Sequence, residues 1–565
     1  MASTTSEKTR VLVVGAGATG MSAAYALSHH PDKFETTVYE RSLYAGGMAT
    51  SVPIDKERFG ADYINDGVQG ASPVFYNTYA IFEKLGFVAS DVEMQVSFGR
   101  DATEFWSNVF PSKAIDEFTP DIRKFGTVLK IIKAFEVLFA IISVSAMLRL
   151  FWFSKSFGDT IVFPLVALFF GTGNQTPFVS SAILERVFMD DNMRLFEYSP
   201  DTFLASIPKM KAFPRLSILY ERWKSFVEEQ GQGSVRVVLG REVTRIQRSS
   251  RKRGAIEVWS RPTKGTNNEQ EVVDPAGSEY YEVFDEIIIC TDADAALKIL
   301  GSDATFLERR VLGNVKYLWD VTVTHSDLNY MEKYYRVAYD PRLASSKTKE
   351  NEERRRRCEY AEKNFAPLYF IRSYPTDKSK IEMSFDLTNY QPQFDGVSPH
   401  GPRAPECEEL SAPDGEEEGR GRPSRSPAQS DNSQRKIPLD RHVFQTIFLD
   451  NSPDSSGLWS KDEIQPEKVI LQKWWKQQSH RWQHYAGTVP WMGLINGKNH
   501  TYFAGAWTVL NMHEIAVVSG FGAAYRLGAA YPFSKSRECK RLFALCYAVN
   551  HMKRLRAEDR EGSFA

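Results

Sequence analysis

The sequence contains few cysteines and no long uninterrupted hydrophobic run. Its five cysteines form no CxxC pair and no metal-ligand spacing, which argues against a metal site and points to a reducing compartment. In the most apolar region, residues 118–172, the longest uncharged stretch before Arg149 is VLFAIISVSAML, 12 residues long. A membrane-spanning helix needs about 20 apolar residues. We therefore expect no metal site and no segment that crosses a membrane.

An excess of one charge is also missing, because 70 Lys and Arg residues balance 71 Asp and Glu residues. The resulting net charge of −1 argues against a nucleic-acid partner. The first ten residues, MASTTSEKTR, are polar and run straight into a strand, which does not fit a signal peptide. We expect a cytoplasmic protein, and association with a membrane surface stays open as an alternative.

Aromatic residues, by contrast, are plentiful at 13% of the chain. A chain of 565 residues can bury a large core and should form two or more lobes, and such a core would use many of these rings. A lipophilic substrate cavity would use the others. We expect a large core together with a cavity of this kind.

The most informative stretch begins with VLVVGAGATG at Val11. Four apolar residues predict a buried strand, and Gly15, Gly17 and Gly20 follow in the GxGxxG spacing before a helix-compatible segment. In such a turn the first glycine permits the bend, the second lets the backbone approach a pyrophosphate, and the third lets the helix pack on the strand. Glu40 ends the next predicted strand, 20 residues past Gly20, where a carboxylate can accept hydrogen bonds from ribose hydroxyls. The pattern predicts a dinucleotide site.

This motif does not by itself separate FAD from NAD(P). The pair Gly46-Gly47 follows six residues after Glu40. It predicts either a plain turn or a second segment whose backbone, free of side chains, lies close to a cofactor. The turn-rich segment 61–70 follows soon after and could pass under a flavin ring.

Between the two ends of the chain, short strands are predicted at 235–239, 243–246, 255–259 and 287–290, which return the chain to a dinucleotide-type sheet. The two apolar pieces within 118–172 are interpreted as helices of a substrate-covering lobe, with docking on a membrane surface as the alternative. Residues 395–438 are rich in Pro, Gly, Ser and charge, which predicts a disordered insertion between strands at 381–387 and 443–449.

Near the carboxyl end, a strand at 502–504 leads through FAGAW to a predicted helix at 514–527, and a further amphipathic helix is expected within 534–560. Together with the first motif, this unit resembles the FAD-dependent amine oxidase and phytoene desaturase superfamily. The sequence is most similar to a branch of predicted NAD/FAD-binding proteins associated with cyclopropane-fatty-acid synthases. That branch reads approximately FAGAWTGYGFHEDGLRSG, which this chain matches at 503–508, 513–514 and 519–520. Residues 509–512 replace GYGF, and 515–518 replace DGLR.

The resemblance implies an α/β fold, with a Rossmann-type FAD-binding domain (GR2-like, amine oxidase type) and an inserted α+β substrate lobe. The predicted FAD domain comprises 10–72, 232–300 and 495–530, and the substrate lobe 73–231 and 301–494. Residues 1–9 would be a flexible tail and 531–565 a carboxyl-terminal helix.

The resemblance also implies the site residues. Trp507 and His513 would neighbour the flavin ring, and His513 could act as an acid or base or, alternatively, only bond the backbone at a helix start. Val243 would present its backbone to the adenine. The implied FAD-binding set is Gly15, Ala16, Gly17, Thr19, Gly20, Glu40, Arg41, Gly46, Gly47, Val243, Gly505, Ala506, His513 and Glu514.

Three functions stay open. The first is an FAD-dependent oxidoreductase that abstracts hydride from a lipophilic small molecule, with the cofactor performing the chemistry. The second is a flavin amine oxidase, which needs aromatic walls beside the ring. The third is a non-enzymatic flavin-binding or membrane-associated protein, suggested by the altered residues 509–512. A simple NAD(P) dehydrogenase would leave the carboxyl-terminal motif unexplained.

Overall fold

The computed structural model describes residues 7–170, 175–190, 194–248, 256–267, 270–273, 279–395 and 437–560. Residues 396–436 of the predicted disordered insertion at 395–438, and residues 1–6 of the predicted flexible tail at 1–9, lie outside these ranges.

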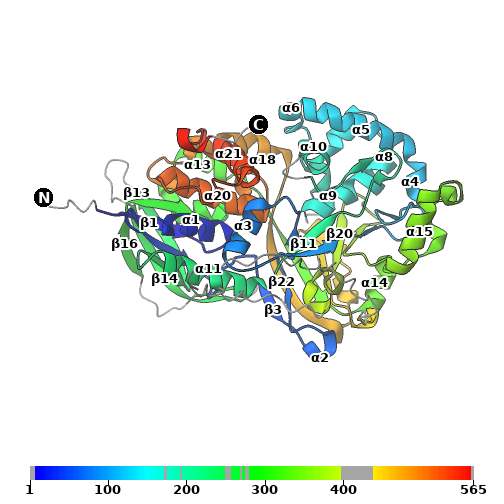
Figure 1. Cartoon of the computed structure of the whole chain (residues 1–565), viewed down its shortest axis with the longest axis horizontal. Helices are drawn as coiled ribbons and strands as arrows, with labels where there is room; N and C mark the ends of the chain where they lie inside the picture. Colours follow the sequence, from blue (N-terminus) through cyan, green and yellow to red (C-terminus); the bar gives the residue numbers. More distant parts are fainter. Residues whose placement is uncertain are drawn as a thin grey trace, which may run out of the picture.

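A five-stranded parallel sheet organises the half of the molecule on the left of Figure 1. Its strand order is β12-β2-β1-β17-β23, so each of three distant chain segments contributes to it. The predicted buried strands at both ends of the chain are confirmed. The bounds are β1 (Thr9–Val14), β2 (Phe34–Glu40), β12 (Val235–Leu239), β17 (Glu286–Ile289) and β23 (Thr501–Phe503).

The two faces of this sheet are covered by different layers. Val11 and Val13 pack toward helices α1 (Ala18–Ser28), α11 (Leu216–Gln230) and α20 (His513–Leu527). Leu12 and Val14 pack toward α12 (Ala293–Leu300) and an antiparallel meander. Because side chains alternate along a strand, the run VLVV can fill both layers. The meander consists of β13 (Arg241–Arg248), β14 (Ile256–Asn267), β15 (Gln270–Val273) and β16 (Tyr280–Phe284).

Helix α11 corrects one predicted boundary. The sequence assigned everything up to residue 231 to the substrate lobe, but the Phe226 ring of α11 stacks on Tyr25 of α1 at 5.4 Å. The Glu228 carboxylate also accepts a hydrogen bond of 2.9 Å from the Val237 N–H of β12. Helix α11 therefore belongs to the layer on the parallel sheet.

The second half of the molecule is built on a seven-stranded sheet with the order β22-β18-β21-β20-β19-β7-β8. Strands β20 and β21, which flank the predicted insertion, are neighbouring antiparallel partners. The bounds are β7 (Val96–Phe98), β8 (Trp106–Ser107), β18 (Tyr317–His325), β19 (Tyr369–Ser373), β20 (Ile381–Asp386), β21 (Phe444–Asp450) and β22 (Val469–Gln478). Helices α14 (Leu328–Tyr334) and α15 (Glu352–Asn364) lie beside this sheet (Figure 1).

A cluster of helices covers the top of this second half (Figure 1). Its interior is aromatic, and the Phe125 ring meets those of Phe157 and Phe203 at 6.0 and 5.5 Å. The first apolar piece folds as α6 and α7 with a turn between them, and the second is helical as far as Phe170, so both predicted helices are confirmed within the described residues. None of the described helices is long and apolar enough to cross a membrane. The bounds are α4 (Lys113–Glu117), α5 (Thr119–Ala134), α6 (Glu136–Phe139), α7 (Val144–Leu150), α8 (Lys155–Phe157), α9 (Phe163–Phe170) and α10 (Ala182–Met189).

Two further helices complete the layer around α20. Helix α3 (Tyr76–Lys84) meets its first turn, and the predicted carboxyl-terminal helix, α21 (Arg537–His551), packs along it. Helices α1 and α20 approach each other through glycine, since a Cβ on Gly520 would lie 2.1 Å from the Thr19 carbonyl oxygen.

This approach predicts a position-specific effect within one helix. Gly520→Ala should lower the free energy of unfolding by about 2 to 3 kcal/mol, because the new methyl group forces two backbones apart. Gly522→Ala, two residues away, is the control. A Cβ there has no atom closer than 3.4 Å, so the variant should be neutral or gain up to about 1 kcal/mol of helix propensity. Urea denaturation measures both, and equal midpoints would contradict the prediction.

Candidate functional site

The first glycine turn joins β1 to α1, and two of its glycines are required by the fold. Gly15 has a φ of +102°, and a Cβ there would lie 3.2 Å from the Cys290 carbonyl oxygen. A Cβ on Gly20 would lie 1.8 Å from the Gly15 carbonyl oxygen. Both positions therefore exclude a side chain whether or not a ligand binds, while Thr19 lies buried between them in the first turn of α1.

Gly17 is different, because nothing in the chain requires a glycine there. Its φ of −73° suits any L-residue. The nearest atoms to a Cβ on Gly17 are the Gly46 oxygen and the Gly47 Cα, both 4.0 Å away. Space for a side chain is present, so the reason for glycine at this position must lie outside the chain.

The second glycine turn lies directly beside the first. The Gly46 N–H donates a hydrogen bond of 2.9 Å to the Ala16 carbonyl oxygen, and Gly17 and Gly46 pair as in a parallel sheet. Gly47, with a φ of +60°, is exposed at this junction. The structure thus brings the two predicted glycine motifs together as one cradle, which we define as residues 15–17 and 46–47.

Glu40 faces this cradle from the end of β2. Its carboxylate accepts hydrogen bonds from the Ala16 N–H at 2.7 Å and from the Ser42 N–H at 2.9 Å. The side chain is buried, at 7% exposure, so Glu40 is not a solvated acid at a strand end. A carboxylate has about four acceptor positions, which leaves capacity for ribose hydroxyls. The neighbouring Arg41 is exposed, and its carbonyl oxygen accepts from the Thr263 hydroxyl.

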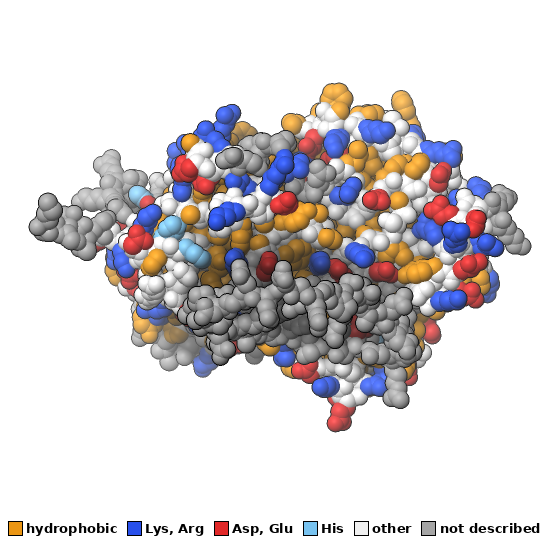
Figure 2. Space-filling view, in the orientation of Figure 1, with side chains coloured by type: hydrophobic (Ala, Val, Ile, Leu, Met, Phe, Trp, Pro, Cys, Tyr) orange, Lys and Arg blue, Asp and Glu red, His pale blue; other side chains and the backbone are white. Residues whose placement is uncertain are grey.

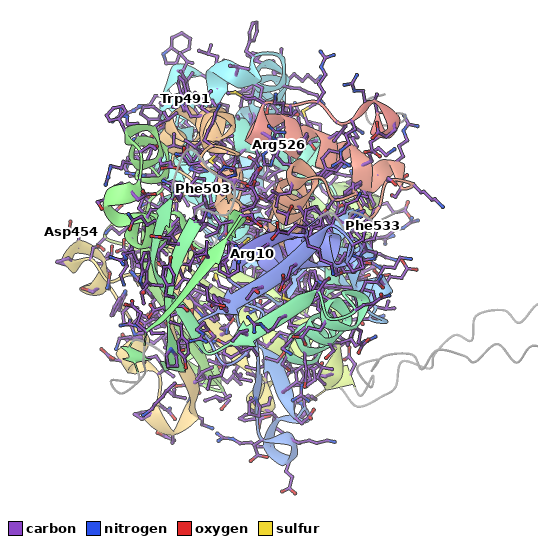
Figure 3. All side chains as sticks on the ribbon, turned by 90° about the vertical axis from the view of Figure 1, so that its left-hand side faces the viewer. Arg10, Asp454, Trp491, Phe503, Arg526 and Phe533 are labelled. Atoms are coloured by element: carbon purple, nitrogen blue, oxygen red, sulfur yellow. The ribbon has the colours of Figure 1, made fainter. Side chains whose placement is uncertain are left out.

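The carboxyl-terminal unit adds a second helix start, which follows β23 of the same parallel sheet as β1. The FAGAW turn is tied to α20, because the Gly505 N–H donates to the Ser519 hydroxyl at 3.0 Å and the Thr508 hydroxyl donates to the Gly505 oxygen at 2.8 Å. Ala506 within the turn is partly exposed. Helix α20 has no side-chain cap, so the N–H groups of its first turn can face a ligand. In Figure 3, Phe503 at the end of β23 lies above Arg10 of β1, with Arg526 of α20 to its right.

Glu514 does not turn its side chain toward a ligand. Its carboxylate accepts hydrogen bonds from the backbone N–H groups of Asn77 and Thr78, at 2.9 and 2.7 Å, and from the Asn77 side chain at 2.8 Å. Burial raises the pKa of Glu514, and these hydrogen bonds oppose that shift. The carboxylate therefore holds the start of α3, and only the backbone of this residue remains available as a cofactor contact.

His513 bonds to side chains on two other helices. One ring nitrogen lies 3.0 Å from the Thr78 hydroxyl and the other 2.9 Å from the Tyr220 hydroxyl. The Tyr220 ring in turn packs where a Cβ on Gly46 would lie, at 3.4 Å. Burial lowers the pKa of His513 to about 4, so the ring is neutral at pH 7. With both nitrogens occupied, the structure favours a positioning role over the predicted acid–base role.

Trp507 is packed inward. Its side chain is 4% exposed, and the indole N–H donates to the Thr291 carbonyl oxygen at 3.0 Å. This arrangement favours a structural role over the predicted place beside the ring. Val243 is likewise buried, in the core between β13 and the parallel sheet, and the register of β13 shifts just after it.

One charged group near the cradle has no signal in the local sequence. Lys473 of β22 contacts the Asp66 carboxylate at 2.9 Å, and Thr50 donates to that same carboxylate at 2.5 Å. Trp475 covers Gly67, where a Cβ would lie 2.8 Å from the indole ring. The segment 61–70 therefore lies beneath β22, next to the second glycine turn. Only the tertiary structure joins Lys473 to residues some 400 positions earlier in the chain.

Burial of neutral histidines predicts a pH dependence of stability. The pKa values of His325, His484 and His513 fall to about 4, below the ordinary value of about 6.5. Between pH 6.5 and pH 4 these histidines are protonated in the unfolded chain but stay neutral in the folded chain. The free energy of unfolding therefore decreases as the pH falls from 6.5 toward 4.

His513→Gln should therefore lose less stability than the wild type between pH 7 and pH 5, by about 1 to 2 kcal/mol. His29→Gln, at an exposed ring at the end of α1, is the control and should follow the wild type. Urea denaturation at the two pH values measures the difference. The same loss in all three proteins would show that His513 does not resist protonation.

Comparison with known proteins agrees with this architecture. Residues 13–83 match a family model described as an NAD(P)-binding Rossmann-like domain. No curated protein shows a significant match to the sequence. Among solved structures, a CLA-producing fatty acid isomerase from P. acnes is 12% identical with a TM-score of 0.52, covering 91% of this chain and 98% of its own.

Two amine oxidases are similar to the same extent. A double mutant of putrescine oxidase is 11% identical with a TM-score of 0.54, covering 93% of this chain and 99% of its own. Cyclohexylamine oxidase from Brevibacterium oxydans is 12% identical with a TM-score of 0.51, covering 92% of this chain and 99% of its own. Over nine-tenths of its length, the chain therefore has the amine oxidase-type fold, an α/β structure built on a Rossmann-like dinucleotide-binding domain.

Proposed function

We propose that this protein is an FAD-dependent oxidoreductase that removes hydride from a lipophilic small molecule. The observation that carries the proposal is Gly17, which is glycine although neither its φ of −73° nor its neighbours at 4.0 Å require it. A side chain there would project into the cradle. The close approach of a ligand's phosphates to the backbone explains its absence.

Electrostatics at the cradle suit a pyrophosphate. Helix α1 begins at the carboxyl end of β1, and α20 follows β23 of the same parallel sheet. Both helix starts carry unpaired N–H groups and the positive end of a helix dipole, which favour anions. Lys473 neutralises Asp66, so the loop beside the cradle adds no net negative charge.

The extent of the cradle favours FAD over a nicotinamide cofactor. A single GxGxxG turn would suffice for either, but here the Gly46-Gly47 turn and the start of α20 extend the site beyond it. Glu40 would accept hydrogen bonds from ribose hydroxyls and would repel a 2′-phosphate, which argues against NADP.

Bound FAD would supply the two-electron acceptor, and this chain would supply position and charge. The start of α20 would stabilise negative charge at the pyrimidine end of the reduced ring. His513 would hold that helix start through Thr78 and Tyr220, and Tyr220 would fix the Gly46 turn at the same time.

A lipophilic substrate is supported by the surroundings of the loop 66–70. A pocket of about 260 Å3 opens just after it, with Pro73, Val74, Leu195 and Phe196 among its lining residues. The remaining lining residues are Arg194, Glu197, Ser206, Pro208 and Lys209. A larger pocket of about 400 Å3 is lined by Glu332 and residues 335–342, and neither pocket includes a residue of the glycine turns. The smaller pocket has the more apolar side chains and follows the loop 66–70 in the chain, so we take it as the candidate for substrate entry.

Gly17→Val tests the cofactor assignment. The wild type should purify yellow with bound FAD, whereas the variant should be colourless yet melt at an unchanged temperature in the absence of flavin. Gly457→Val is the control, since its φ is −66° and its Cβ would meet only one atom, at 3.7 Å. The control should keep its flavin. A wild type that takes up no FAD on reconstitution, or a Gly17→Val protein that retains it, would overturn the assignment.

A second experiment tests the substrate class. Anaerobic addition of a lipid extract should bleach the flavin absorbance of the wild type, and added oxidant should restore it. An amine panel should leave the spectrum unchanged, because Trp507 is buried and does not form the aromatic wall that amine oxidation was expected to need. Bleaching by amines with release of peroxide would instead establish an amine oxidase. Inertness toward both would leave a flavin-binding protein without turnover.

A further inference from the structure

We propose that one edge of the helical cluster docks on a lipid surface that carries anionic headgroups. The docking edge consists of six exposed hydrophobic residues from the end of α5 to the turn after α7, namely Phe135, Val137, Leu138, Ile141, Leu150 and Trp152. Val137 and Trp152 are each 88% exposed. A monomeric protein rarely gathers apolar side chains of this size on one contiguous surface without a partner for them.

These residues share one surface because their segments are packed together. Phe139 of α6 stacks on Phe151 at 6.1 Å, which joins α6 to the turn after α7. The Phe153 N–H donates to the Leu148 carbonyl oxygen at 2.9 Å and closes that turn. In Figure 1, α6 forms the upper edge of the molecule, and Figure 2 shows hydrophobic side chains projecting there above Lys and Arg side chains.

Trp152 is held outward by its backbone. Its φ is +49°, a left-handed conformation that is unusual for a bulky residue. The Lys124 ammonium donates to the Trp152 carbonyl oxygen at 2.8 Å, and the Trp152 N–H donates to the Arg149 carbonyl oxygen at 3.0 Å. The turn therefore presents the Trp152 indole to solvent, at 88% exposure. Tryptophan is enriched at membrane–water interfaces, where its amphipathic ring is stable.

Two unpaired positive charges beside the docking edge favour an anionic surface as its occupant. Between Thr119 and Thr160 the chain carries six basic residues and three acids, although the whole protein has a net charge of −1. Each of these acids is paired, Asp121 with Lys124, Glu136 with Arg186 and Asp159 with Lys155. Lys130 and Arg149 are exposed and form no ion pair within the described part of the chain. The other four basic residues all contact acids, so the unpaired positive charge of this surface lies on Lys130 and Arg149.

The same charges argue against a second copy of the chain as the occupant. Two docking edges facing each other would bring the unpaired Lys130 and Arg149 of one copy against those of the other, and like-charge contacts are unfavourable at an interface. An anionic bilayer offers both requirements at once, hydrocarbon for the apolar side chains and phosphate or carboxylate for Lys130 and Arg149. Since no described helix can span a bilayer, the contact would be peripheral.

Vesicle flotation tests this proposal on the full-length protein. The wild type should float with vesicles of phosphatidylcholine and phosphatidylserine, bind neutral phosphatidylcholine vesicles weakly, and lose affinity as salt is raised. Trp152→Asn, in which asparagine tolerates the left-handed backbone, should bind anionic vesicles at least roughly fivefold more weakly. Neutralising two charges in the Lys130→Gln, Arg149→Gln double variant should weaken binding by roughly twentyfold, and only on anionic vesicles.

Phe306→Asn is the matched control, because Phe306 is 84% exposed at the start of α13 (Phe306–Leu312), outside the docking edge. It should bind as the wild type does, and all variants should keep the wild-type melting temperature. Gly17→Val, the variant expected to lose flavin, should bind vesicles as the wild type does. Loss of flavin and loss of vesicle binding can therefore be told apart. Absence of vesicle binding, equal loss in Phe306→Asn, or a wild-type dimer in gel filtration that Trp152→Asn dissociates would overturn the proposal.

Discussion

The close contact between helices α1 and α20 is the constraint on which the rest of the structure depends. At Gly520 the two helix backbones approach more closely than any side chain allows. Because one helix follows the first strand and the other the last strand of the same sheet, this contact closes the fold between its two ends. The chain between them supplies the other strands of the parallel sheet and the whole of the second half of the molecule. The contact joins Thr19 in the first turn of α1 to Gly520 in the middle of α20, and it thereby fixes one helix against the other.

Around that pair, buried polar groups fix positions rather than carry reactivity. Glu514 ties the start of α20 to the start of α3, and His513 ties it to α11 through Tyr220. Glu40 holds the first glycine turn by its backbone. A buried carboxylate with several N–H donors and a neutral imidazole with two hydroxyl partners each have their hydrogen-bonding capacity met. Such groups resist rearrangement, which suits a site that must bind a large cofactor without reorganising.

Sequence reasoning predicted the elements whose causes are local. The strand and turn at 11–20 follow from a run of β-branched residues and glycine spacing, and α20 follows from its small and apolar residues. Prediction failed where a side chain had a distant partner. The direction of Trp507 depends on the Thr291 carbonyl, and that of Glu514 on Asn77 and Thr78. Gly17 and Gly20 also look alike in the motif, yet the fold requires a glycine at position 20 and does not require one at position 17. Lys473 had no local pattern at all.

Joining the first strand to the last has a consequence for synthesis. His513 leaves the ribosome 493 residues after Gly20, which at 5 to 20 residues per second is roughly half a minute to a minute and a half later. Throughout that interval α1 lacks the helix that covers it, and its buried small residues Ala23 and Ala24 are without their native partner. The nascent chain can form its first glycine turn early, but α1 gains its covering helix only when almost all of the protein has been made.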